Sequence, residues 1–162
     1  MYIENDLIIE DAKLGFLNFA GKVGPFNPSG KRSFAVFFDK EVGLGLEKDG
    51  WGISWTKPRE DDDEPKPFLR VAVSFDNIPP KIVLINPRSK IILDEKDVHM
   101  LDWVEIESVD LILNPYNWEF NGKTGVKAYL KSMYITKKED AFEAKYEDIA
   151  YQTPVEPEFD GD

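Results

Sequence analysis

The chain has 162 residues, which is enough for one well-buried core and leaves little for a second domain. Its residues are 42% hydrophobic and 13% aromatic, a composition that favours a folded protein. It contains no cysteine, which excludes disulfides, thiolate metal sites and cysteine nucleophiles. Residues 1–15 lack the basic start and apolar core of a signal peptide, and no apolar run approaches the length of a membrane span. We expect a cytoplasmic protein with a single folded domain.

The net charge of −11 at first argues against a nucleic-acid partner, because phosphate binding requires lysine and arginine. The negative charge is concentrated, however. Residues 139–162 hold nine acidic residues and one lysine, and residues 60–64 read EDDDE. Outside these two blocks the net charge is +2. Such segregation fits a nucleic-acid-binding body with a repelling acidic tail, and it equally fits segments that only keep the protein soluble.

Several segments of the first half of the chain read as strands, because apolar and polar residues alternate or form short runs bounded by glycine and proline. They lie at 7–21, 33–39, 51–56 and 68–75. Segment 25–32, PFNPSGKR, is a turn-forming loop. Residues 40–50 leave room for one short helical turn, because Gly43, Gly45 and Gly50 weaken a helix. Alternation also predicts which strand residues face the core: Phe34, Val36, Phe38, Leu69, Val71, Val73 and Phe75.

In the second half, two short strands at 81–86 and 90–94 precede the clearest helix, at 94–103. Asp94 is its expected N-cap, and its expected apolar side consists of Val98, Leu101 and Trp103. Two long strands follow, at 108–120 and 125–135, and Asn121-Gly122 between them is a strong hairpin signal.

The order of these elements predicts a mainly β fold. We expect an OB-like five-stranded barrel with extra short strands, one helix before the last two strands, and a disordered acidic C-terminal tail. The expected boundaries are 1–138 for the barrel domain and 139–162 for the tail. A β-sandwich is the alternative, because strand count alone does not fix closure.

Single-stranded nucleic acid is bound by cations that follow the phosphates and by aromatic rings on which bases stack. In the last strand, Lys127, Tyr129 and Lys131 share one face by alternation, which indicates a binding face over a core face. A solvated face with one exposed tyrosine explains the same pattern. The candidate phosphate contacts are Lys31, Arg32, Arg70, Lys123, Lys127 and Lys131. The candidate stacking residues are Phe37, Trp55, Tyr116, Trp118 and Tyr129.

The sequence offers no catalytic constellation, so we expect a protein that is not an enzyme and binds no cofactor or metal. His99 is the single histidine and lies among apolar residues of the expected helix. Residues 43–50 lack the lysine and hydroxyl ending of a phosphate-binding loop, and residues 60–64 lack the ligand spacing of a calcium loop.

The chain resembles phage-encoded single-stranded-DNA-binding proteins of the OB-fold type. The resembling runs are NFAG (18–21), NPSGKRSFAVFFD (27–39), DGWGISWTKPRE (49–60), NIPPKIVLI (77–85) and the run LDWVEIESVDLILNPYNWEFNGKTGVKAYLKSMYIT (101–136). The resemblance implies non-catalytic, sequence-tolerant coating and protection of single-stranded DNA during phage replication or recombination, in the cytoplasm of a bacterial host.

The resemblance also implies that the tail contacts phage or host replication proteins, with Glu158, Phe159, Asp160 and Asp162 as candidate contacts. The terminal EFDGD lacks the last apolar pair of the common bacterial tip, which puts binding of the same host partners in doubt. Two further possibilities are that the tail competes with DNA for the cations of the barrel and that the protein forms a homodimer. Two alternatives remain: an acidic protein-interaction factor, such as a DNA mimic or inhibitor of a host protein, and a carbohydrate-binding or phage structural β-domain.

Overall fold

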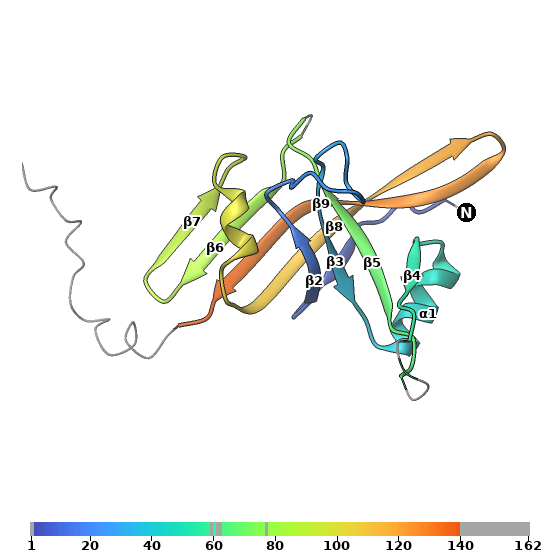
Figure 1. The fold of residues 1–162 in the computed structure, drawn as a ribbon, viewed down its shortest axis with the longest axis horizontal. Helices are drawn as coiled ribbons and strands as arrows, with labels where there is room; N and C mark the ends of the chain where they lie inside the picture. The colour runs from blue at the N-terminus through green and yellow to red at the C-terminus, as the bar shows by residue number, and fades with distance from the viewer. Residues whose placement is uncertain (1, 59, 61–62, 77, 140–162) are drawn as a thin grey trace, which may run out of the picture.

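The computed structural model describes residues 2–58, 60, 63–76 and 78–139, in which nine strands form one sheet (Figure 1). The strands are β1 (Leu7–Ile9), β2 (Lys13–Asn18), β3 (Arg32–Phe37), β4 (Ile53–Trp55), β5 (Pro67–Val73), β6 (Lys81–Asn86), β7 (Ser89–Leu93), β8 (Ile106–Phe120) and β9 (Lys123–Lys137). An α-helix, α1 (Lys40–Asp49), and a 3-10 helix, η1 (Val98–Asp102), accompany them within these residues. Neither of the two helices of this described part has the length and apolar character needed to cross a membrane.

The central strands form a partly open barrel. Along the path β1-β8-β9-β5-β3-β2, neighbouring strands are hydrogen-bonded, and only β5 and β9 pair in parallel. The two ends of this path, β1 and β2, are separated in the chain by residues 10–12 alone. Within that link, the Ala12 N–H donates to the Val109 carbonyl of β8 at 2.7 Å. With β1 and β2 taken as one bent strand, the five strands of an OB-type barrel are present, and the mainly β prediction is confirmed.

The predicted extra strands extend the sheet beyond the barrel. β6 pairs in parallel with β9 from Lys81 opposite Ser132 to Ile85 opposite Thr136, and so continues along the edge of β9 that β5 occupies earlier. β7 then pairs with β6 as a hairpin, and β4 pairs with the first half of β5.

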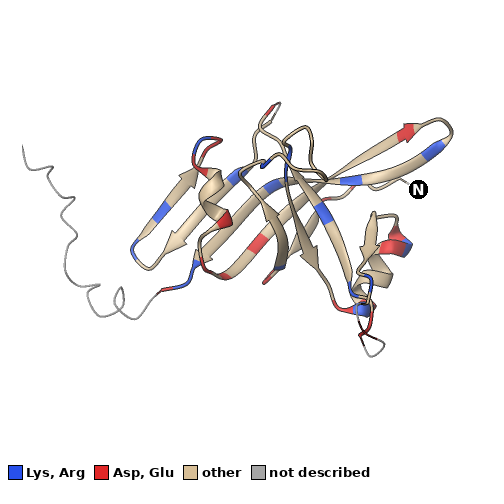
Figure 2. Cartoon of the chain, in the orientation of Figure 1, with Lys and Arg blue, Asp and Glu red and all other residues tan. Residues whose placement is uncertain are grey.

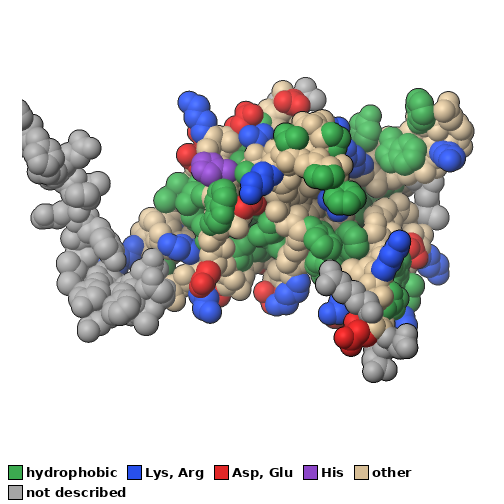
Figure 3. All heavy atoms as spheres, in the orientation of Figure 1, with side chains coloured by type: hydrophobic (Ala, Val, Ile, Leu, Met, Phe, Trp, Pro, Cys, Tyr) green, Lys and Arg blue, Asp and Glu red, His purple; other side chains and the backbone are tan. Residues whose placement is uncertain are grey.

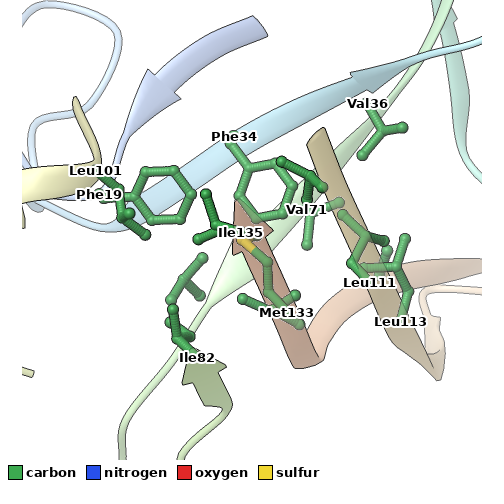
Figure 4. Packing of buried hydrophobic residues seen from close by; sticks show 14 of the residues in the cluster. Phe19, Phe34, Val36, Val71, Ile82, Leu101, Leu111, Leu113, Met133 and Ile135 are labelled. Atoms are coloured by element: carbon green, nitrogen blue, oxygen red, sulfur yellow. The ribbon is translucent and has the colours of Figure 1, made fainter. Parts of the chain in front are cut away.

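The core lies between the two halves of the curved sheet, where side chains of β3, β5, β6, β8 and β9 converge (Figure 4). The Phe19 and Phe34 rings stack at 5.2 Å between centroids. The core side predicted for β3 and β5 is confirmed: five of its residues are buried, and Phe38 and Phe75 pack against the cluster while partly exposed. The five buried residues are Phe34, Val36, Leu69, Val71 and Val73.

The helix expected at 94–103 forms only as the five-residue 3-10 helix η1. The Asp94 carboxylate accepts the N–H groups of Lys96 and Asp97, at 2.9 and 3.1 Å, and therefore holds a tight turn before η1. The prediction for its apolar side is right for two residues, which are buried, and wrong for Trp103, which is 68% exposed.

The ten-residue α1 forms where only one helical turn was expected. Gly43 makes this helix possible at its position, because a Cβ there would lie 2.4 Å from the Cβ and Cγ of Pro67 in β5. Gly50 ends the helix with φ of 113°, in the left-handed region that favours glycine. Gly43 therefore sets where α1 packs and Gly50 where it stops, although glycine lowers the intrinsic helix propensity.

β8 and β9 continue past the barrel as a hairpin, and we call its projecting part, residues 115–127, the arm (Figure 1). Asn121 and Gly122 turn its tip with φ of 50° and 77°, as the sequence predicts. The N-terminal segment is hydrogen-bonded to the β8 strand of the arm. The Asn117 side chain accepts from the Ile3 N–H and donates to the Ile3 carbonyl, each at 2.8 Å.

Candidate nucleic-acid interface

One side of the curved sheet points away from the core, and we call it the outer face. The strand register aligns one row of residues across it from β2 to β8, because directly paired residues point to the same side of a sheet. In order, the row consists of Asn18, Ser33, Ala72, Tyr129 and Asn114. Tyr129 is the one large side chain in a row of small or polar residues, which leaves its ring accessible from the outer face.

Three phenylalanine rings form an aromatic cluster at one end of the outer face. Phe16, Phe37 and Phe68, here called the phenylalanine triad, lie with their ring centroids 5.5 Å apart in every pair. Phe37 lies across Gly15 of the neighbouring strand, where a Cβ would be 2.4 Å from the ring. Phe16 is 56% exposed, so the triad presents part of this ring to solvent.

A second set of aromatic rings follows one side of the arm. Tyr116, Trp118 and Phe120 alternate along β8 and are all exposed, Phe120 at 70%. Trp118 lies across Gly125, its cross-strand partner, where a Cβ would be 2.5 Å from the indole. Because these three residues have the parity of Asn114, the side of the arm that they line is continuous with the outer face.

Cations lie among these rings. The Lys127 ammonium is 5.1 Å from the centroid of the Tyr129 ring, and the Tyr116 ring meets that of Tyr129 edge-on at 5.9 Å. Arg70 is exposed beside the central row, and Lys123 lies opposite Phe120 near the tip of the arm. Figure 2 shows basic positions on β5 and on the arm. Among the described residues, no carboxylate forms an ion pair with Arg70, Lys123 or Lys127. Figure 3 shows hydrophobic side chains clustered over the arm and the front strands.

The structure brings most of the predicted binding residues onto this one surface. They are Phe37, Arg70, Tyr116, Trp118, Lys123, Lys127 and Tyr129. Lys131 lies at its margin, where its ammonium is 2.7 Å from the Asp6 carboxylate. Lys31 is exposed in the loop just before β3.

Two predicted residues lie elsewhere. Arg32 has the parity of the core side of β3, and its guanidinium is 3.6 Å from Glu95 and 5.5 Å from the centroid of the Phe75 ring. The Trp55 indole N–H donates to the Glu47 carboxylate of α1 at 3.0 Å, and its strand position pairs with Pro67 on the side opposite Phe68. The tail candidates Glu158, Phe159, Asp160 and Asp162 lie outside the described residues.

The sequence-based site missed Phe16, Phe68 and Phe120. Strict alternation places Phe68 on the same side of its strand as Arg70, and Phe120 on the same side as Trp118. The sequence therefore contained the signal for both residues. Phe16 reaches the outer face through a bulge in β2, with φ of 49°, and alternation does not foresee such a bulge. Within the described residues, no three His, Asp or Glu side chains are placed to share a metal ion.

The model of one protein family, described as a putative phage ssDNA-binding domain, matches residues 1–156. Among solved structures, the chain is similar to the single-stranded DNA-binding protein from bacteriophage Enc34. A C-terminally truncated form of that protein aligns with a TM-score of 0.52 and 11% identity over 83% of this chain and 87% of the other. A further structure of the same protein aligns with a TM-score of 0.51 and 10% identity over 83% and 82%. Its complex with ssDNA aligns with a TM-score of 0.50 and 11% identity over 83% and 88%. No curated protein matches the sequence.

Proposed function

The chain belongs to the family of the phage ssDNA-binding domain, and from this premise we propose that it binds single-stranded DNA along the outer face and the arm. One observation carries the proposal: aromatic rings and unpaired cations, which single-strand binding requires together, share one continuous surface. The phosphates are held by Arg70, Lys123 and Lys127, and the bases stack on Tyr129, on Trp118 and on the phenylalanine triad. Binding tolerates any sequence, because every base offers a π-face to these rings.

The protein acts without catalysis, as a coat that protects single strands during phage replication or recombination in the host cytoplasm. Support for a non-catalytic role comes from the kind of family to which the chain belongs, and from a surface that offers stacking and charge. The tail, residues 139–162, recruits replication proteins or regulates access to the outer face through its net charge of −8.

Titration of fluorescein-labelled oligo-dT with the full-length protein, followed by anisotropy, tests the proposal. We expect saturable binding that weakens steeply as the salt concentration rises, because cations contact the phosphates. A titration with oligo-dA should give a similar affinity, because the protein does not distinguish one base from another. Absence of any salt-dependent binding would overturn the proposal and favour an acidic protein that imitates DNA.

A further inference from the structure

Trp103 is an aromatic side chain outside the surface described above. It caps η1 at its C-terminal end and is 68% exposed, whereas Val98 and Leu101 of the same turn are fully buried. Its ring and the His99 ring lie in a T-shaped arrangement, with their centroids 6.0 Å apart. Most of the indole is nevertheless open to a ligand, as its exposure shows.

The backbone that carries Trp103 is fixed to the barrel. The Asp102 carboxylate accepts the N–H groups of Phe19 and Ala20, at 2.8 and 3.0 Å, and so joins η1 to the end of β2. These two hydrogen bonds also engage the negative charge next to the indole. Trp103 is thus presented at a defined position, and not on a free loop.

Trp103 lines two hollows. The first is also lined by Leu17, Asn18 and Lys22 of the barrel side, and the second by Met100, by Glu105 and by two consecutive lysines at the end of β9. The two lysines are Lys137 and Lys138. Figure 3 shows hydrophobic side chains next to the single histidine in this part of the molecule. An aromatic ring that shares each of its two hollows with lysine has the composition of a base-stacking site.

The first of these hollows begins where the outer face ends. Asn18 is the β2 member of the row that crosses the outer face to Tyr129 and Asn114. Leu17 precedes it and follows Phe16 of the phenylalanine triad. A DNA strand that leaves the triad or the row over β2 therefore reaches the hollow that Lys22 and Trp103 line.

We propose that Trp103 is a second stacking platform for single-stranded DNA, which extends the bound strand beyond the barrel and over η1. Lys22 and Lys138 hold the phosphates on either side of the stacked base. One exposed ring suits one base, whereas a specific protein interface needs about 800 Å² on each partner. The inference rests on the proposed function, because it prolongs the same DNA path.

Oligo-dT of two lengths separates this site from the outer face, with about 6 nucleotides for the outer face alone and about 16 to reach η1. The wild-type protein should bind the long oligonucleotide more tightly. Trp103→Ala should lower that affinity by about 5- to 150-fold and leave the short oligonucleotide unaffected. Trp103→Phe retains a ring and should recover most of the affinity, while the tryptophan quenching caused specifically by the long oligonucleotide is lost.

Each result is decisive. If Trp103→Ala matches the wild type at both lengths, or weakens both equally, Trp103 is not a platform, although DNA binding at the outer face stands. If the wild-type protein binds neither oligonucleotide, the proposed function itself fails. A thermal melt of each variant identifies unfolding, which the exposure of Trp103 makes unexpected.

Discussion

Two rings of the proposed binding surface owe their orientation to a missing side chain. Phe37 lies across Gly15 and Trp118 lies across Gly125, and in both places a Cβ would be within about 2.5 Å of the ring. A glycine beneath an aromatic ring leaves room for the ring to lie over the neighbouring strand. Gly125 therefore fixes the position of Trp118, one of the rings on which we propose that bases stack.

Tyr129→Ala should weaken binding of oligo-dT by about 5- to 150-fold, the loss expected for one stacked base. The ring is half-buried in the outer face next to Tyr116, so the fold should persist. Anisotropy titrations measure the affinity and a thermal melt measures the stability. Tyr134→Ala is the matched control, because Tyr134 lies on the same strand beside Lys81, where β9 pairs with β6, and so away from the row, the phenylalanine triad and the arm that hold the proposed contacts. Equal affinities of Tyr129→Ala and the wild type would contradict the assignment of the outer face.

Arg70→Ala should flatten the dependence of affinity on salt. Each phosphate neutralised on a single strand contributes about 0.7 to the slope of log K against log salt, so loss of one contact should reduce the slope by about that amount. Titrations at several salt concentrations give the slope. Lys90→Ala removes the same charge from the exposed face of β7, and its slope should equal that of the wild type. A reduction in both variants would mean that net charge, and not position, controls binding.

At the scale of elements, α1 shows two glycines with opposite roles. Gly43 is buried against Pro67, whereas a Cβ at Gly45 would meet no atom within 4 Å. Gly45→Ala should raise the free energy of unfolding by about 1 kcal/mol through helix propensity. Gly43→Ala gains the same propensity but should lower the free energy of unfolding, because the added methyl group collides with β5. Urea denaturation of the two variants measures both, and stabilisation by Gly43→Ala would show that α1 does not pack as described.

The elements that the sequence predicted well are those specified locally. Alternation identified the two sides of β5, and Asn121-Gly122 identified the arm, because each signal lies within a few residues of the structure that it describes. α1 was missed because Gly43 makes sense only beside Pro67, which belongs to another element. For the same reason Trp103 was assigned to the core: its direction depends on the tight turn that Asp94 imposes and on the attachment of η1 to β2.

The site follows the same division. The side of β9 that carries Lys127 and Tyr129 could be derived from parity alone. Parity within one strand does not say which strands are neighbours, so the union of that side with Arg70 and the phenylalanine triad required the β5–β9 pairing. Arg32 shows that local composition does not identify the side of the sheet on which a residue lies. It is a basic residue next to the predicted site, but it lies on the other side of the sheet.

At the scale of the whole molecule, a chain ending at Lys138 should bind oligo-dT more tightly than the full-length protein. Removal of residues 139–162 changes the net charge from −11 to −3, which weakens repulsion of DNA and removes any competition for the cations of the outer face. Paired titrations at low and high salt measure the gain, which should shrink at high salt because screening shortens the range of charge interactions. Unchanged affinity would restrict the tail to contacts with other proteins.

The bent first strand has a consequence for how the protein is made. Leu7 to Ile9 pair with Leu111 to Leu113, so the barrel is incomplete until β8 has left the ribosome. Until then the nascent chain displays unpaired strand edges and half of an apolar core, the state in which β proteins aggregate. Contacts of such sequence separation also slow folding, since a long loop must close before they form. The geometry that wraps the sheet into a barrel therefore makes folding a late event, because β1 waits for β8 and β5 waits for β9.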